Sequence, residues 1–220
     1  MKIAIDGPAG SGKSTIARKL SVRLGIPYLE TGLAYRAAGF LVLKHLGAVS
    51  ELSWKEIEPL LHRLEIEPRV GKTVVRVDGE ELGEELKGED VGRVASLVGT
   101  VGRFREFINE YFRSLLKGRQ AVVEGRDAGT NIIPDAELKL FITASPEERA
   151  ERRFRQLKRA GVEVSYEEIL RGIVERDERD SQRKDYPFKP APDAVIVDTT
   201  GKSVDEVIRE IISMVERVRE

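Results

Sequence analysis

Short apolar runs of the length typical of β-strands recur along the chain, and stretches with helical spacing of apolar residues separate most of them. Such alternation predicts a parallel sheet covered by helices on both faces. The predicted strands are residues 2–6, 27–29, 121–124, 138–142 and 194–197. The sequence therefore predicts an α/β fold around a parallel sheet of about five strands, with ligands at the carboxyl ends of those strands.

The stretch from about residue 41 to residue 93 breaks this rhythm. It holds a helical pattern over residues 53–64 and two further strand-like segments, 65–69 and 73–77, followed by an Asp-Gly turn signal. Two more helical patterns follow, at about 89–101 and 103–117. We interpret the irregular stretch as a small α+β insertion carried on the main sheet.

Composition narrows the class of protein. The chain has 37 basic and 38 acidic residues, so its net charge of −1 gives no case for nucleic-acid binding. The chain contains no long uncharged apolar run, so we predict no membrane span. The first strand is predicted to begin at residue 2, which leaves no room for a secretory signal. Cysteine is absent, which excludes disulfides and thiolate zinc sites and suits a reducing cytoplasm.

A phosphate-binding loop is predicted at residues 7–15, GPAGSGKST, which fit the pattern G-x-x-x-x-G-K-[ST] directly after the first strand. Glycines let the backbone N–H groups point at phosphate oxygens, and the following helix adds the positive end of its dipole. Lys13 would reach the β- and γ-phosphates, and the Ser14 hydroxyl would coordinate magnesium. The motif predicts nucleotide binding but names no reaction.

Asp6 ends the first predicted strand, immediately before this loop. Its carboxylate could hold a metal-bound water, as hard cations prefer oxygen ligands. It could equally cap the loop. The sequence leaves these two alternatives open.

One face of the helical segment that begins near Ser165 starts apolar and becomes charged. Five side chains on this face lie within about 40° of one line at 100° per residue: Ile169, Ile173, Arg176, Asp180 and Arg183. We interpret it as a face that emerges from the core into an anion-binding cleft. The alternative is a solvated helix stabilised by its own (i, i+4) ion pairs.

Two further regions carry arginines next to predicted ligand positions. Arg126 follows the buried strand 121–124 and could hold phosphate through its planar fork, while Glu124 or Asp127 could act on magnesium or on a polar base edge. A tight loop with an internal Arg–Asp pair is the alternative. Arginines at 149, 152 and 153 precede a turn around 160–164, which predicts a small helical lid. Two phosphate-binding regions besides the loop favour transfer between two phosphorylated ligands over hydrolysis.

Five motifs in this order resemble bacterial-type cytidylate kinases, which are P-loop nucleoside-monophosphate kinases. They are IDGPAGSGKST, YLETGLAYR, EGRDAGTNIIPDA, ERAERR and ERDERDSQR, and the resemblance runs from about residue 2 to the last helix. It implies a P-loop NTPase-type fold with a monophosphate-binding insertion at about 39–93 and a lid at about 149–183. The core would then comprise about residues 1–38, 94–148 and 184–220.

The resemblance also implies the site residues. Those expected to bind ATP are Gly7, Pro8, Ala9, Gly10, Ser11, Gly12, Lys13, Ser14 and Thr15, with Ser14 as the metal ligand. Those expected to bind the acceptor CMP are Thr31, Arg36, Ser96, Arg105, Arg126, Asp127, Arg176, Asp180 and Arg183. Those expected to act in catalysis are Lys13, Arg126, Arg153 and Arg183. Among the acceptor residues, Ser96, Arg105 and Asp127 would read the cytosine edge, and Asp180 would meet a ribose hydroxyl.

The reaction implied is in-line transfer of the γ-phosphoryl group of ATP to the phosphate of CMP or dCMP, with Mg²⁺ as cofactor. We also expect a monomer, because no obvious apolar surface patch argues against one, and a cytoplasmic enzyme, because cysteine is absent. The acceptor oxygen is already anionic, so positioning and charge neutralisation suffice without a strong general base. Glu124 stands where aspartate is common in the family, and Gly102 where proline is common.

Other functions stay open at this stage. A related kinase could act on UMP, AMP or a non-nucleotide acid. A regulatory GTPase would need a guanine-reading N-K-x-D segment, which the chain lacks. A non-catalytic nucleotide-binding protein would not need the arginines around 126 and 176–183.

Overall fold

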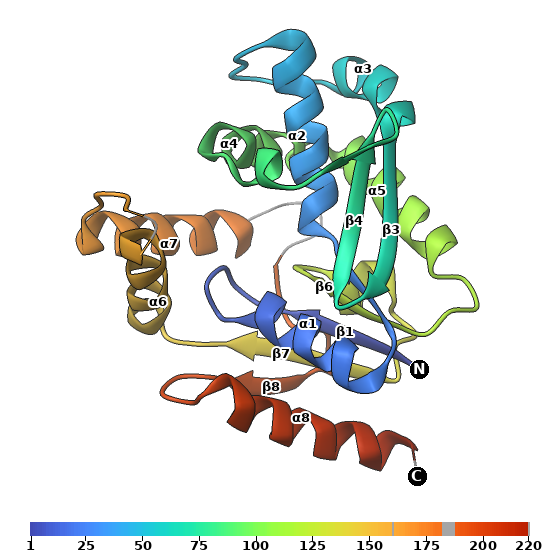
Figure 1. Ribbon diagram of the computed structural model, residues 1–220, viewed down its shortest axis with the longest axis vertical. Helices are drawn as coiled ribbons and strands as arrows, with labels where there is room; N and C mark the ends of the chain where they lie inside the picture. The colour runs from blue at the N-terminus through green and yellow to red at the C-terminus, as the bar shows by residue number, and fades with distance from the viewer. Residues whose placement is uncertain (160, 182–187, 220) are drawn as a thin grey trace.

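An eight-stranded sheet organises the chain in the computed structural model, which describes residues 1–159, 161–181 and 188–219 (Figure 1). The strand order is β5-β4-β3-β2-β6-β1-β7-β8. The five neighbouring strands from β2 to β8 in this order are parallel. They are β1 (Lys2–Asp6), β2 (Pro27–Glu30), β6 (Ala121–Gly125), β7 (Leu138–Thr143) and β8 (Val195–Asp198). The predicted α/β fold with about five parallel strands is therefore confirmed.

Three antiparallel strands extend the same sheet beyond β2: β3 (Leu64–Val70), β4 (Lys72–Val77) and β5 (Glu80–Leu82). Asp78 and Gly79 join β4 to β5 with φ values of 53° and 82°. Positive φ at both positions is what a tight two-residue hairpin turn requires. The sequence predicts β3 and β4 but not β5, because the Glu-Glu-Leu of β5 is too short and polar to show an apolar pattern.

The predicted continuous helix over residues 53–64 is wrong in its second half. The segment begins as α3 (Trp54–Ile57), where Ser53 and Glu56 form a capping box. It then tightens into the 3-10 helix η1 (Glu58–Arg63), which has Pro59 in its first turn. Proline has no N–H to bond back to the preceding turn, so the α-helical ladder is interrupted there.

Helices cover both faces of the sheet and create two hydrophobic clusters. Along β1, Ile3 and Ile5 face one cluster and Ala4 faces the other, as the alternation of a strand requires. The first cluster is completed by α1 (Lys13–Leu24) and α8 (Val204–Arg219). The second is completed by α2 (Gly32–Leu46), α4 (Glu89–Val98) and α5 (Gly102–Leu115), with the 3-10 helix η2 (Glu84–Lys87) and the π-helical turn η3 (Ala128–Ile132).

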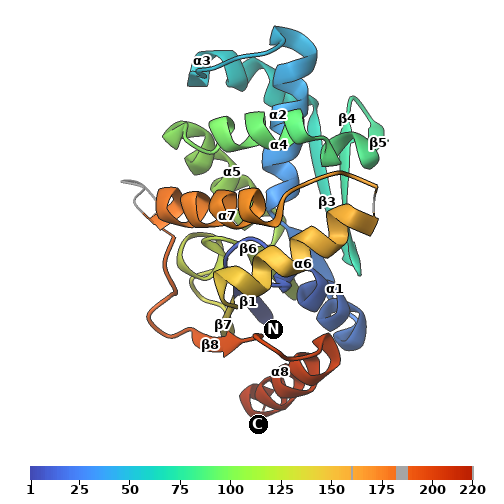
Figure 2. The ribbon, with the colours of Figure 1, turned by 90° about the vertical axis from the view of Figure 1, so that its left-hand side faces the viewer.

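Two further helices, α6 (Pro146–Arg159) and α7 (Tyr166–Ser181), pack side by side at one side of the molecule (Figures 1 and 2). The rings of Phe154 and Tyr166 meet edge to face between them, with centroids 6.3 Å apart. The side chains of residues 179–181 at the end of α7 lie outside the described part. Among the described residues, no helix combines the length and apolar character needed to cross a membrane.

The packing of α2 against α4 depends on Gly39, and this generates a prediction. A Cβ atom at Gly39 would lie 2.8 Å from the backbone nitrogen of Ala95 and 3.0 Å from the carbonyl oxygen of Val91. We expect Gly39→Ala to lower the free energy of unfolding by about 1–3 kcal/mol, because the two helices must move apart. Urea denaturation measures this change.

The matched control is Gly172→Ala in α7, where, apart from the adjoining residues and backbone of the helix itself, no atom of the described residues lies within 4 Å of the added carbon. There the higher helix propensity of alanine should raise the free energy of unfolding by about 0.5–1 kcal/mol. A Gly39→Ala protein as stable as the wild type would show that the helices tolerate this carbon.

Candidate functional site

Acidic side chains gather where the central parallel strands end. Asp6 ends β1, Glu30 ends β2, and Glu124 lies one residue before the end of β6. Glu124 is in register with both Ile5 of β1 and Glu30 of β2. The three carboxylates therefore lie at the carboxyl edge of the sheet, where ligands of open α/β folds bind.

The predicted phosphate loop leaves this edge between β1 and α1. A Cβ at Gly7 would lie 2.1 Å from the carbonyl oxygen of Ile142. Gly10 has a φ of 78°, and a Cβ there would lie 3.2 Å from Cβ of Arg149. The loop is thus packed against the end of β7 and the first turn of α6, and only glycine fits at these two positions. Helix α1 begins at Lys13, so its free N–H groups face the loop, an arrangement that binds anions.

Lys13 and Ser14 both contact Glu124, which is only 4% exposed. The Nζ atom of Lys13 lies 3.3 Å from Oε1 of Glu124 and also donates to the Pro8 carbonyl at 3.4 Å. The Ser14 hydroxyl donates to Oε2 of Glu124 at 3.1 Å. Burial lowers the pKa of Lys13, Glu124 counteracts this, and the charges of Arg126 and Arg176 lower it further.

Tyr28 links Glu124 to Glu30. Its hydroxyl oxygen lies 3.1 Å from Oε2 of Glu30 and 3.3 Å from Oε2 of Glu124. A hydroxyl carries one proton and can donate to only one of these oxygens at a time. Burial raises the pKa of Glu30, and the charge of Glu124 raises it further. Sequence reasoning did not single out Tyr28 or Glu30, although both lie in the motif YLETGLAYR.

The residues around Ser14 fit magnesium held together with nucleotide phosphates. The Ser14 hydroxyl and the carboxylates of Glu124 and Glu30 are hard oxygen ligands. Within the described residues, no group of three or more acidic or histidine side chains could hold a metal ion by itself. Mg²⁺ commonly takes one or two protein oxygens and completes its shell with water and phosphate, so the donor set suits this ion.

Of the two alternatives for Asp6, the structure contradicts capping of the phosphate loop, because Asp6 holds a different turn. Its two carboxylate oxygens accept hydrogen bonds from the backbone N–H groups of Ala128 and Gly129, each at 2.8 Å. Asp6 therefore anchors η3, which follows the motif EGRD, rather than the phosphate loop. Burial raises the pKa of Asp6 to about 6 despite these two hydrogen bonds, and the charges of Asp127 and Glu124 add to the increase.

Thr31 and Arg36 lie on the side of the sheet that continues into β3. The Thr31 N–H donates to the Glu124 carbonyl at 3.0 Å, which fixes the chain after β2 against β6. Arg36 on α2 donates to the Leu86 carbonyl at 2.7 Å. Burial lowers the pKa of Arg36, the charges of Arg176 and Arg153 lower it further, and Glu30 counteracts them. Arginines of α2, α6 and α7 therefore lie close enough for their charges to influence one another.

Arg105 and Asp127 form a second polar cluster and are each only 5% exposed. The NH1 atom of Arg105 donates to the Tyr35 hydroxyl at 3.1 Å and lies 3.7 Å from Oδ2 of Asp127. The guanidinium also lies 5.5 Å from the centroid of the Tyr35 ring. Ser96 is half-buried on α4. Sequence reasoning missed Tyr35, which orients Arg105.

The remaining predicted site residues differ in their exposure and contacts, and two of them are not fully described. The guanidinium of Arg126 lies over the Phe188 ring, 4.9 Å from its centroid. Arg153 is exposed on α6, where its NH1 donates to Gln156 at 3.0 Å, and Arg176 is exposed on α7. Asp180 belongs to α7, but its side chain lies outside the description, and Arg183 lies outside the described residues altogether.

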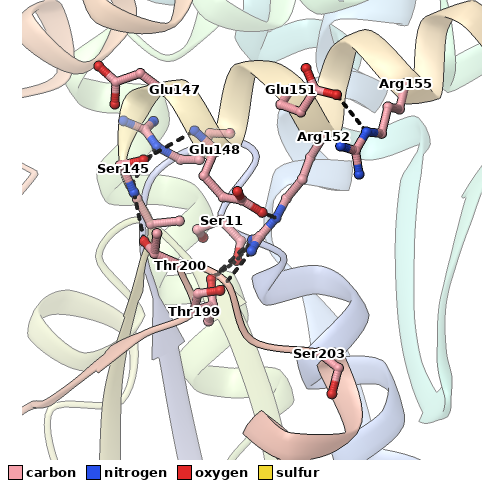
Figure 3. A network of polar contacts seen from close by, with 12 residues as sticks. Ser11, Ser145, Glu147, Glu148, Glu151, Arg152, Arg155, Thr199, Thr200 and Ser203 are labelled. Atoms are coloured by element: carbon pink, nitrogen blue, oxygen red, sulfur yellow. Dashed lines mark hydrogen bonds and ion pairs between the residues drawn. The ribbon is translucent and has the colours of Figure 1, made fainter.

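Two arginines of α6 donate hydrogen bonds to backbone carbonyls of the phosphate loop. Arg152 donates to the Ser11 carbonyl at 3.2 Å and to the carbonyl of Thr199 at 2.8 Å, while Glu148 holds its Nε at 3.0 Å (Figure 3). Arg149 donates to the Ala9 carbonyl at 3.2 Å. The sequence predicts lid arginines here. The two arginines are three residues apart, which places both on one helix face. This spacing is the sequence feature that indicates that both contact the same loop.

The family model and the sequence relatives agree on one family. The family model described as cytidylate kinase matches residues 3–217. A cytidylate kinase from Aquifex aeolicus (strain VF5) is 53% identical, over 98% of this chain and 96% of its own. A cytidylate kinase from Fervidobacterium nodosum is 44% identical, over 99% and 98%. The solved structure of an uncharacterized protein from Eubacterium ventriosum is similar in fold alone, with a TM-score of 0.53, 16% identity and 98% coverage of both chains.

The raised pKa of Asp6 generates a prediction about pH. Because its pKa in the folded protein, about 6, exceeds the ordinary value of 3.8, its contribution to stability is fully present below about pH 4 and is lost as the pH rises through 6. We expect the difference in unfolding free energy between the wild type and Asp6→Asn to fall by about 2 kcal/mol from pH 4 to pH 7. Urea denaturation of the nucleotide-free proteins across this range measures it. A difference that does not change with pH would contradict the raised pKa.

Proposed function

This chain belongs to the cytidylate kinase family, as its five motifs led us to expect, and on that premise we propose that it transfers the γ-phosphoryl group of ATP to the phosphate of CMP or dCMP. The observation that carries the proposal is the convergence of cations from different elements on the carboxyl edge of the sheet. These cations are Lys13 of α1, Arg36 of α2, Arg126 after β6, Arg153 of α6 and Arg176 of α7.

Their mutual electrostatics support two phosphorylated ligands rather than one. Arg176 lowers the pKa of both Lys13, on the phosphate-loop side, and Arg36, on the side of β3. Like charges brought this close repel each other, and phosphates bound between them would relieve the repulsion. Because the charge of Arg176 acts on both residues, we propose that a donor phosphate binds at Lys13 and an acceptor phosphate at Arg36.

Transfer then needs little covalent chemistry from the protein. The acceptor oxygen of a nucleoside monophosphate is already anionic, so holding the two phosphates in line and neutralising their charge is sufficient. We assign Lys13 to the β- and γ-phosphates, Arg36 to the acceptor phosphate, and Arg126 and Arg153 to the transferred group. The motif ERDERDSQR adds Arg183 and Asp180 to the acceptor side as proposals that rest on the sequence.

We propose that Arg105 and Asp127 read the acceptor base together with Ser96, which the sequence motif assigns to the same role. Cytosine carries an amino group at C4, and an aspartate can accept a hydrogen bond from it. Arg105 supplies only donors, which suit the ring acceptors of cytosine. Uracil has an oxygen at C4, which a carboxylate repels. The pair therefore favours CMP and dCMP over UMP.

Magnesium is proposed as the cofactor, with Ser14 as its direct protein ligand and Glu124 beside it. When bound with ATP, the ion neutralises charge on the β- and γ-phosphate oxygens. We also propose that about residues 39–93 form the monophosphate-binding domain, that about 149–183 form the lid, and that the enzyme works as a monomer in the cytoplasm. The lack of cysteine supports this location.

A panel of acceptors tests the function. With ATP and Mg²⁺, a coupled assay should give turnover of CMP and dCMP at least about tenfold above that of UMP and AMP, because each buried polar mismatch costs about 1–3 kcal/mol. Turnover of UMP or AMP above that of CMP would overturn the acceptor assignment. Hydrolysis of ATP without transfer to any acceptor would overturn the kinase.

Replacing Lys13 tests the donor side. We expect Lys13→Ala to lower kcat for CMP phosphorylation by about 10²–10³-fold, because the charge that develops in the transition state loses a positioned cation. The matched control is Lys19→Ala on the same helix, where the exposed lysine pairs with Asp205 at 2.9 Å. Its kcat should stay near that of the wild type. If Lys13→Ala instead lost activity only in proportion to a lowered Tm, Lys13 would be a structural residue.

A further inference from the structure

Arg149 is a cation of α6 that the proposed transfer does not use. It is 3% exposed, so it cannot contact a nucleotide in this arrangement. Its guanidinium makes three hydrogen bonds in three directions. Nε donates to the Ala144 carbonyl at 3.0 Å, NH1 to the Ala9 carbonyl at 3.2 Å, and NH2 to Oδ2 of Asp177 at 2.6 Å. Only the planar fork of arginine can satisfy such a set at once.

The three acceptors belong to three different parts of the site. Ala144 follows β7, so this contact ties the side chain to the rigid sheet. Ala9 belongs to the phosphate loop, whose Gly10 also packs against Arg149. Asp177 belongs to α7 and is the direct neighbour of Arg176, the arginine that influences both Lys13 and Arg36. One buried side chain therefore connects the donor loop with the helix of the acceptor side.

Stability alone gives a poor reason for this ion pair. Oδ1 of Asp177 is buried and, within the described residues, has no hydrogen-bond partner. A buried acceptor without a partner costs free energy, and the ion pair itself is only partly buried, because the Asp177 side chain is 27% exposed. Ion pairs that are partly removed from water often contribute little to stability. The pair leaves one carboxylate oxygen without a partner, so a role in fixing the positions of the two helices and the loop explains it better than a contribution to stability does.

We propose that Arg149 is a positioning residue that locks the phosphate loop to α7 through Ala9 and Asp177, and so sets the separation between the donor and acceptor cations. The proposal rests on the proposed function for its kinetic consequence, but the lock itself is a property of the chain. In-line transfer depends steeply on such alignment, because a misplacement of about 1 Å can cost about 10²-fold in rate.

The variants are Arg149→Lys, Asp177→Ala and the double variant. Lysine keeps the charge of Arg149 but cannot reach three acceptors. The matched control is Arg155→Lys, also in α6, where the exposed Arg155 pairs with Glu151 at 2.6 Å. Two readouts are taken well below the Tm of each protein: amide hydrogen exchange of residues 9–12, and kcat with the KM values for ATP and CMP.

We expect both single variants to speed amide exchange in the loop by at least about tenfold, including Asp177→Ala, whose altered side chain lies on another helix. Both should lower kcat by about 10–100-fold while changing each KM less than about threefold. The double variant should show no faster loop exchange and no lower kcat than the more affected single variant, because both substitutions break the same contact between Arg149 and Asp177. Arg155→Lys should resemble the wild type in both readouts.

Unchanged loop exchange in Asp177→Ala would overturn the lock, whatever reaction the enzyme catalyses. Faster exchange with an unchanged kcat, or a loss confined to Tm or to one KM, would overturn the positioning role. Failure of the proposed function is distinguishable from both outcomes, because it would appear as an inactive wild type on every acceptor while the exchange data still report on the lock.

Discussion

The site depends on one buried negative charge, the carboxylate of Glu124 at the end of β6. A charge removed from water costs several kcal/mol unless a partner and hydrogen bonds compensate it. Glu124 has these partners in Lys13, Ser14 and Tyr28. Because Glu124 sits in a central strand, in register with both neighbours, its position is set by the sheet ladder rather than by the loop. Lys13 is buried beside Glu124 and is its counter-charge. The ion pair therefore fixes the position of the loop lysine at the end of β6.

Glu124 also joins the two halves of the site through its backbone. Its carbonyl accepts the N–H of Thr31, so the chain that leads into α2 and Arg36 starts from the same residue that holds Lys13. The two regions that would carry donor and acceptor phosphates therefore share one anchor in the sheet. Helices α6 and α7 are not part of that ladder, and their alignment needs a separate contact. Arg149 supplies it from the other end of the loop.

Much of the fold could be predicted from the sequence, because β1, β6 and β7 are almost wholly buried and all five parallel strands appear as apolar runs. The phosphate loop could be located for a similar reason, since its glycines and Lys13 stand at fixed spacing after the first strand. Elements without a pattern escaped prediction: β5 is acidic and exposed, and Pro59 changes a helix type without ending the helical spacing. Within the site, the roles of Tyr35, Arg149 and Asp6 depend on contacts between residues far apart in the chain. Asp6, for example, meets Gly129, 123 positions away, and no local spacing encodes that.

Some buried polar atoms of the described chain lack hydrogen-bond partners, and their positions bear on why the fold tolerates them. Ser11 Oγ lies in the phosphate loop, the Asn109 amide lies one helical turn after Arg105, and Asp177 Oδ1 belongs to the residue that Arg149 holds. Each costs about 1–3 kcal/mol relative to a satisfied group. Ser11 and Asp177 lie on elements that form the site, and Asn109 lies on α5, the helix that carries Arg105 and also packs into the second apolar cluster. A ligand that binds only the folded state adds RT ln(1 + [L]/Kd) to stability, so nucleotides at cellular excess can offset such costs. The geometry that the site needs is thus kept by polar groups that a core optimised for stability alone would replace.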